Sequence, residues 1–143
     1  MKRQLVSVFA AALGAALLLG GCSNAAGIKA LDRAATVEDT LPGGVSAESD
    51  VAPDATRLLA THDSVKYFVG MKEAGGACLF VVPEADPGLG SAGCTDSPTT
   101  GGEILRVGGP ASPTTLVTDG FDSKKLESEG WTRIHDNLLV KAK

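Results

Sequence analysis

The first 22 residues determine how much of this chain is left to form a folded domain. Lys2 and Arg3 give a positively charged start, and residues 5–19 form an almost uninterrupted apolar stretch that ends in small residues and Cys22. This three-part layout is typical of an export signal that is removed from the mature protein. An apolar run of about 15 residues is also short for a membrane-spanning helix, which needs roughly 20. We therefore expect residues 1–21 to be removed before the rest of the chain folds outside the cytoplasm.

The residues at the expected cleavage site, Leu19-Gly20-Gly21-Cys22, resemble the lipobox of bacterial lipoproteins. Gly20 departs from the commonest form, which carries Ala or Ser at that position. The resemblance covers residues 1–22 and implies that Cys22 receives a diacylglyceryl group and, with further fatty acylation such as palmitate, becomes the new N-terminus. Two acyl chains hold a protein at a membrane, whereas a single chain binds only marginally. It therefore implies a lipid anchor on the extracytoplasmic face of the cell membrane. A plain secretory signal and a membrane-spanning helix are the alternatives.

Two cysteines, Cys78 and Cys94, remain once Cys22 is assigned to the lipid. An even pair in an exported domain is typical of a disulfide. The bridge would close a loop of about 17 residues, which contributes about 3 kcal/mol in the chain-entropy model. A zinc pair and a redox dithiol are the alternatives, but the chain contains no CxxC and its two histidines are far apart in the sequence. We expect no metal and no cofactor.

The mature chain is acidic. Lys2 and Arg3 leave with the signal, so the net charge becomes 11 − 17 = −6. No cluster of Lys and Arg provides the footprint that nucleic acid or an anionic membrane surface requires. Membrane attachment therefore depends on the lipid, and an envelope protein is the candidate partner.

Composition divides the mature chain at about residue 53. Residues 22–52 consist mainly of small and polar residues and contain no aromatic side chain. Such a segment buries too little apolar surface to order itself. It predicts a flexible linker with a reach of roughly 30 Å, which would lift a globular domain over residues 53–143 clear of the lipid headgroups.

Periodicity in residues 53–143 predicts a small α+β domain. Asp54 is expected to cap a short helix with Ala55, Leu58 and Leu59 on one face. A second helix is expected between Asp122 and Gly130. The expected strands are 64–71, 77–82, 103–107, 114–118, 131–135 and 138–141. They predict a single antiparallel sheet of about six strands in hairpins, with one or two short helices, one disulfide and a long loop over residues 83–102. The strand 77–82 is apolar on both faces, which predicts a central position.

One group of short motifs resembles small exported actinobacterial domains that have no assigned activity. The resemblance implies a fold and no mechanism. Its motifs are Tyr67-Phe68-Val69-Gly70, Cys78-Leu79, Cys94 and Trp131-x-Arg133-Ile134-x-Asp136-Asn137-Leu138-Leu139-Val140.

Catalytic signals are weak. His62-Asp63 and His135-Asp136 each place a base beside a carboxylate, but neither GxSxG nor SxxK accompanies them. His62 is more simply the end of the first helix, and His135 the polar residue before a turn. We assign no catalytic residue, and the sequence favours a non-enzymatic role.

Three further patterns have simpler structural explanations. Gly88–Gly93 satisfies GxGxxG but does not lead from a strand directly into a helix. Glu84, Asp86 and Asp96 miss the spacing of a calcium loop and are expected to be solvated. Trp131 and Arg133 share a strand face and would suit an interaction surface, although a core position for Trp131 is the favoured alternative.

The sequence therefore predicts a lipid-anchored envelope protein whose domain is a binding or interaction module with an unknown ligand. A hydrolase that uses His62 or His135 is one alternative, and a structural spacer without a ligand is another. The chain does not indicate an oligomeric state.

Overall fold

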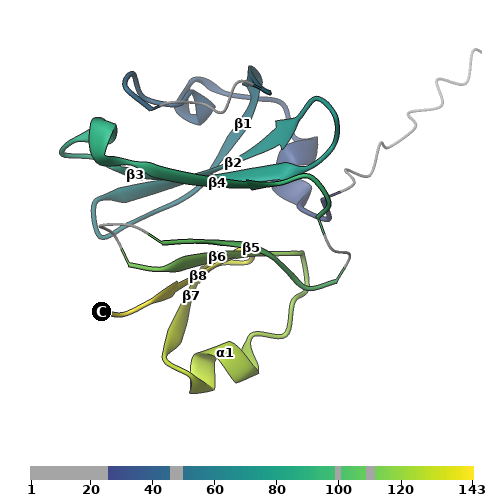
Figure 1. The fold of residues 1–143 in the computed structure, drawn as a ribbon, viewed down its shortest axis with the longest axis vertical. Helices are drawn as coiled ribbons and strands as arrows, with labels where there is room; N and C mark the ends of the chain where they lie inside the picture. The colour runs from purple at the N-terminus through teal and green to yellow at the C-terminus, as the bar shows by residue number, and fades with distance from the viewer. Residues whose placement is uncertain (1–25, 46–49, 99–100, 109–111) are drawn as a thin grey trace, which may run out of the picture.

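The computed structural model describes residues 26–45, 50–98, 101–108 and 112–143, which form two four-stranded antiparallel sheets packed face to face (Figure 1). The first sheet has the order β1-β2-β3-β4, and its strands are β1 (Val51–His62), β2 (Val65–Lys72), β3 (Ala77–Pro83) and β4 (Ser91–Thr95). The second sheet has the order β5-β6-β8-β7, and its strands are β5 (Glu103–Val107), β6 (Thr114–Val117), β7 (Trp131–His135) and β8 (Leu138–Lys141). The expected export signal and Cys22 lie outside the described residues.

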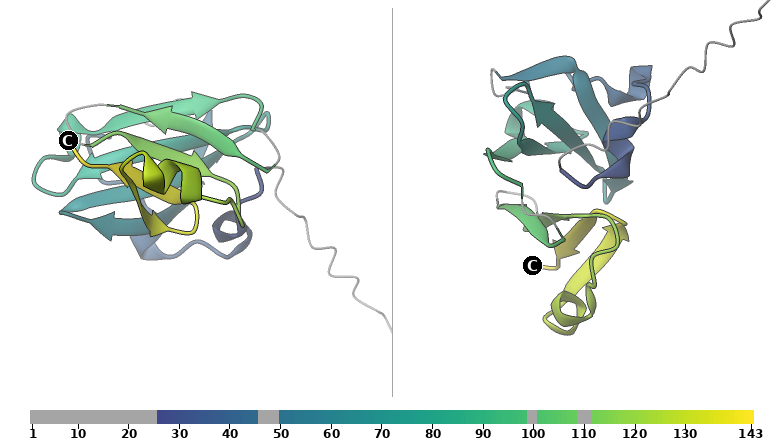
Figure 2. Two further views of the ribbon diagram at one scale, coloured as in Figure 1. Left: turned by 90° about the horizontal axis from the view of Figure 1, so that it is seen from below. Right: turned by 90° about the vertical axis from the view of Figure 1, so that its right-hand side faces the viewer.

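The expectation of a single six-stranded α+β sheet is wrong, because the protein is mostly β and has two sheets. All six expected strands are present with nearly the expected bounds, as are their three hairpins. Two strands, β1 and β4, were not expected. With these two strands the chain forms two separate layers, which lie one above the other in the right view of Figure 2.

The first unexpected strand, β1, replaces the helix predicted from Asp54. Leu58 packs against the cluster on the outer face of the first sheet, whereas Leu59 packs between the sheets. Neighbouring side chains on opposite faces are a property of strands and not of helices. The helical spacing of the apolar residues was therefore misleading, and His62 ends a strand.

The second unexpected strand, β4, lies in the segment expected to be a long loop. Its glycine and small residues have low strand propensity, so tertiary contacts determine its conformation. A Cβ atom on Gly93 would lie 3.0 Å from the side chain of Val107, which shows how closely β4 approaches β5. The GxGxxG glycines lead from a 3-10 helix, η3 (Pro87–Leu89), into this strand and not from a strand into a helix.

Apolar side chains fill three layers. The layer between the sheets takes residues from both, including Val69, Leu79, Leu116 and Leu138. β3 is buried along both faces, as expected for a central strand, because Phe80 and its neighbours are covered on the outer face as well. That outer cover comes partly from the segment before β1, through Leu41 and Val45.

A short helix, α1 (Lys124–Ser128), covers the outer face of the second sheet (Figure 1). Asp122 accepts a hydrogen bond from the Lys124 amide at its start. Gly130, with φ of 92°, follows its end. Leu126 is buried with Trp131 and two residues of the sheet, which fixes the helix on the domain.

The described part of the expected linker belongs to the fold. Ala26 and Ile28 are buried between the sheets, and two 3-10 helices, η1 (Lys29–Asp32) and η2 (Val37–Asp39), follow along β1. The Asp119 amide donates to the Gly27 carbonyl at 2.8 Å, and the Lys29 amide donates to Asp119 Oδ2 at 2.9 Å. The globular unit therefore begins at least as early as Ala26 and not at residue 53.

Asp39 connects the segment before β1 to the edge of that strand through hydrogen bonds. Its buried carboxylate accepts two hydrogen bonds from Arg33 at 2.6 Å, one from the Thr36 amide at 2.7 Å and one from the Leu58 amide at 2.8 Å. The Arg33 guanidinium and the backbone donors hold the pKa of Asp39 well below its usual range. Leu58 belongs to an edge strand, so its amide would otherwise be available for pairing with a strand of a second chain. The Asp39 carboxylate accepts a hydrogen bond from this amide and so protects the edge.

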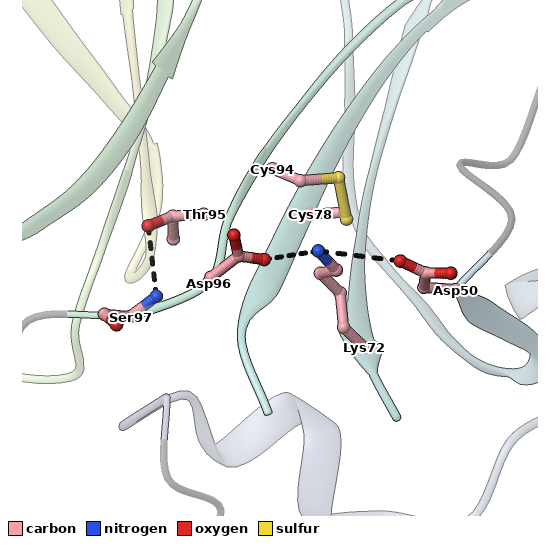
Figure 3. Close-up of a disulfide and its surroundings, with 7 residues drawn as sticks. All are labelled: Asp50, Lys72, Cys78, Cys94, Thr95, Asp96 and Ser97. Atoms are coloured by element: carbon pink, nitrogen blue, oxygen red, sulfur yellow. Dashed lines mark hydrogen bonds and ion pairs between the residues drawn. A yellow bond between two sulfur atoms is a disulfide. The ribbon is translucent and has the colours of Figure 1, made fainter. Parts of the chain in front are cut away.

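Cys78 and Cys94 form the expected disulfide (Figure 3). They are directly opposite each other in β3 and β4. Lys72 lies beside the bridge and forms ion pairs with Asp96 and, at 3.8 Å, with Asp50. The disulfide therefore ties the short strand β4 to the centre of its sheet.

Removing the disulfide should destabilise the domain by about 2–3 kcal/mol. The double replacement Cys78→Ala and Cys94→Ala removes the cross-link that closes the loop between β3 and β4 in the unfolded chain. Urea unfolding of the oxidised protein and the double variant measures the difference. An unchanged midpoint and slope would show that strand pairing alone holds β4.

Candidate functional site

The candidate site is a pocket of about 320 Å³ at one end of the interface between the sheets. The β1–β2 turn forms one wall, and the end of β8 with the residues after it forms the other. Its lining residues are His62, Asp63, Val65, Tyr67, Ser112, Thr132, Val140, Lys141, Ala142 and Lys143.

Tyr67, Val65 and Val140 provide the apolar part of the pocket. The Tyr67 ring is buried in the apolar layer between the sheets. Burial raises the pKa of Tyr67 above 10.0, so the phenol is neutral at physiological pH.

The β1–β2 turn presents the polar groups at the pocket mouth. Asp63 and Ser64 have φ of 49° and 58°, which matches the two-residue turn with both φ values positive that suits twisted hairpins. His62 Nε2 lies 3.3 Å from Asp63 Oδ2, and both side chains are accessible to solvent. The imidazole and the carboxylate are thus available to a ligand.

Basic residues gather at the pocket although the chain is acidic. His62 and Lys143 line it beside Asp63, whereas the ammonium group of Lys141 lies 5.9 Å from the Trp131 ring centroid on the outer face of the second sheet. Ser112 and Thr132 add hydroxyl groups that can donate hydrogen bonds. The arrangement suits a small molecule that carries an anionic group.

The structure does not bring the two histidines together. His62 lies at the pocket, whereas His135 ends β7 beside the first residue of β8. His135 Nδ1 accepts a hydrogen bond from the Asn137 amide at 3.1 Å, and Asn137 in turn donates to Val117 O and Asp119 Oδ1, both at 3.0 Å. His135 therefore helps to shape the turn that Asp136 and Asn137 were expected to form.

Stability should fall as the pH drops below about 6.5 because of His135. Burial lowers the pKa of His135 below 6.5, although Asp136 and Asp119 favour the charged form. Between the two pKa values the unfolded chain binds the proton more readily, so acid favours unfolding. His135→Asn keeps an acceptor near the Nδ1 position and should remove this dependence when unfolding is compared at pH 7.5 and 5.5. An identical pH dependence in the variant would contradict the assignment.

Trp131 and Arg133 stabilise the domain around α1. Trp131 is only 6% exposed and packs with Val117, Leu126 and Leu139. The Arg106 guanidinium lies 5.0 Å from its ring centroid. Arg133 donates to the Ser123 hydroxyl and to the carbonyls of Phe121 and Asp136. The packing supports the core alternative for Trp131 and leaves little of its surface for a partner.

The acidic residues of the 83–102 segment have individual partners. Asp86 accepts from the Gly88 amide at the start of η3, Asp96 pairs with Lys72, and Glu84 lies 3.8 Å from Lys66. Across residues 26–45, 50–98, 101–108 and 112–143, no group of three or more His, Cys, Asp and Glu side chains is placed to hold a metal. Within those same ranges, none of the helices has the length and apolar character needed to cross a membrane.

Most of the pocket residues were not predicted as a site. His62 was singled out for its neighbour Asp63, but Tyr67, Ser112, Thr132 and Lys141 come from separate segments that only the packing of two sheets brings together. Among these lining residues, the sequence pattern indicated only that Val65 and Tyr67 share one face of an expected strand. No protein-family model, curated protein or solved structure matches this chain.

Proposed function

We propose that the mature protein is a lipid-anchored binding module of the cell envelope that takes a small anionic solute into the pocket at the β1–β2 turn. The main support for a binding function is the pocket itself. Its volume of about 320 Å³ lies at the lower end of the range for small-molecule sites, about 300–1,000 Å³. It combines apolar walls with hydroxyl groups, an imidazole and Lys143. A concave site of this kind favours binding over the spacer alternative.

The anchor in this proposal rests on the N-terminal sequence. The lipobox-like residues that end at Cys22 provide a site for the diacylglyceryl group, and the acidic mature chain offers no other means of holding an anionic membrane. A disulfide suits a protein that folds on the oxidising, extracytoplasmic side. The proposed location is the outer face of the cell membrane.

Binding of an anion should depend on Lys143. Inorganic phosphate and acetate serve as probes in a titration followed by amide NMR shifts, with the chain from residue 22 carrying Cys22→Ser. We expect shifts concentrated at residues 62–67 and 140–143, and an affinity at least fivefold weaker in Lys143→Met because a positive charge at the pocket is lost.

Lys66→Met is the matched control. Lys66 neighbours Val65 on β2, but its side chain is paired with Glu84 and does not line the pocket. The control should bind phosphate as the unmodified protein does. Equal losses in both variants, or shifts spread over the whole surface, would mean that phosphate responds only to the general charge.

A hydrolase that uses His62 is the second candidate. The observation in its favour is that His62 and Asp63 share the pocket with the hydroxyl groups of Ser112 and Thr132. This function requires that His62→Ala abolish the hydrolysis of a p-nitrophenyl ester probe while leaving phosphate binding within a few fold. Hydrolysis that survives in the variant would exclude His62 as its base.

A further inference from the structure

The way in which the chain joins the fold limits how the domain can lie on a membrane. Ala26 and Ile28 are buried between the sheets, and the Gly27 carbonyl and Lys29 amide are both bonded to Asp119. From Ala26 onward, the chain therefore moves with the domain. Only residues 23–25 separate this point from Cys22.

The covalent reach of that connection is short. Four Cα-to-Cα steps lead from Cys22 to Ala26, and an extended chain covers at most about 3.3–3.6 Å in each step. The lipidated residue therefore lies within about 14 Å of Ala26, whatever conformation the connection takes. A linker that continued to residue 52 would have 30 such steps and a fully extended reach of about 100 Å.

The pocket lies at the opposite end of the domain. Asp119, which holds Gly27 and Lys29, is bonded to Asn137 in the turn just before β8. β8 then runs away from this turn and ends at Lys141 in the pocket. In Figure 1 the C-terminus marks the pocket end, and the purple N-terminal segment lies toward the other end.

The distance between the two ends exceeds the reach of the anchor. Ser112 lies in the pocket, and β6 leads from it to Asp119, which holds Gly27 and Lys29. At about 3.3 Å per residue, the seven steps from Ser112 to Asp119 cover roughly 23 Å. Turning the pocket mouth toward the headgroups would require the connection to span this length, which is greater than about 14 Å.

We propose that the end of the domain formed by Gly27, Lys29, Asp119 and the β7–β8 turn faces a phospholipid bilayer, and that the pocket opens away from it. This inference rests on the lipid anchor of the proposed function. Lys29 and Asp136 are exposed at this end and have opposite charges, which suits contact with zwitterionic headgroups. The pocket then takes its anion from the aqueous phase, and the phosphate of a membrane lipid is excluded as the ligand.

Energy transfer to the membrane surface tests this orientation. The lipidated protein is bound to phosphatidylcholine vesicles that contain an acceptor dye on a headgroup. A donor dye is placed on Asp136→Cys in one preparation and on Ser64→Cys, at the pocket mouth, in another. Transfer should be at least twice as efficient from position 136.

A long insertion provides the control. Twenty Gly and Ser residues placed between residues 25 and 26 should remove the difference between the two positions, because the domain can then turn freely. Equal or stronger transfer from position 64 in the vesicle-bound protein would overturn the orientation while leaving the anchor in place. Failure of the protein to carry a lipid or to bind vesicles would overturn the anchor, and the orientation with it.

Discussion

Asp39→Ala should lower the free energy of unfolding by about 2–3 kcal/mol, the cost of removing a buried, charged acceptor of several hydrogen bonds. The carboxylate accepts bonds from Arg33, Thr36 and Leu58, and its side chain is 3% exposed. Its loss leaves the Leu58 amide at the edge of β1 without its acceptor and detaches the segment that covers this edge. Urea unfolding at pH 7 measures the change.

Glu38→Ala is the matched control for Asp39. The two acidic residues are adjacent in η2, but Glu38 is exposed, so its replacement should change stability by no more than about 0.5 kcal/mol. The pKa of Asp39 is depressed in the folded protein, so its contribution is present above its ordinary value of 3.8 and is lost as the pH falls below it. The difference between Asp39→Ala and the unmodified protein should shrink in that acidic range. Equal effects of the two replacements at pH 7 would contradict the role of Asp39.

Ile28→Ala should cost about 3–5 kcal/mol, in the upper part of the range for large-to-small changes in a core. Ile28 is fully buried between the two sheets, so its truncation leaves a cavity in the core. Thermal or urea unfolding of the variant tests whether the N-terminal segment is part of the cooperative unit.

Val37→Ala provides the comparison within the same segment, since Val37 is 90% exposed. Its replacement should leave stability within about 0.5 kcal/mol of the unmodified protein. If Ile28→Ala were as mild as Val37→Ala, residues 26–45 would behave as the flexible linker that their composition suggests. The short reach of the membrane anchor would then be lost as well.

Local patterns were sufficient for six strands of the fold. The alternation at Val65, Tyr67 and Val69, the continuous apolar run of β3 and the Asp136-Asn137 turn are signals that adjacent residues carry by themselves. The disulfide followed from the parity of the cysteines in an exported chain. These features depend little on how the sheets pack.

The remaining elements depend on contacts between distant segments. β4 is held by β3, by the disulfide and by the close approach of Gly93 to β5. Ile28 and Asp39 lie in a segment of linker-like composition, and their burial is evident only once β1 and the second sheet are in place. The pocket also depends on contacts between distant segments, because its two walls come from turns and strand ends that are far apart in the sequence.

The intact mass of the protein extracted from bacterial membranes tests the central claim most directly. We expect a chain that begins at Cys22, carries a diacylglyceryl group and is two protons lighter than its reduced form because of the Cys78–Cys94 bridge. The variant Cys22→Ser should lack the lipid and leave the membrane fraction. A chain that retains residues 1–21, or one with an unmodified Cys22, would contradict a lipid-anchored protein and the orientation derived from it.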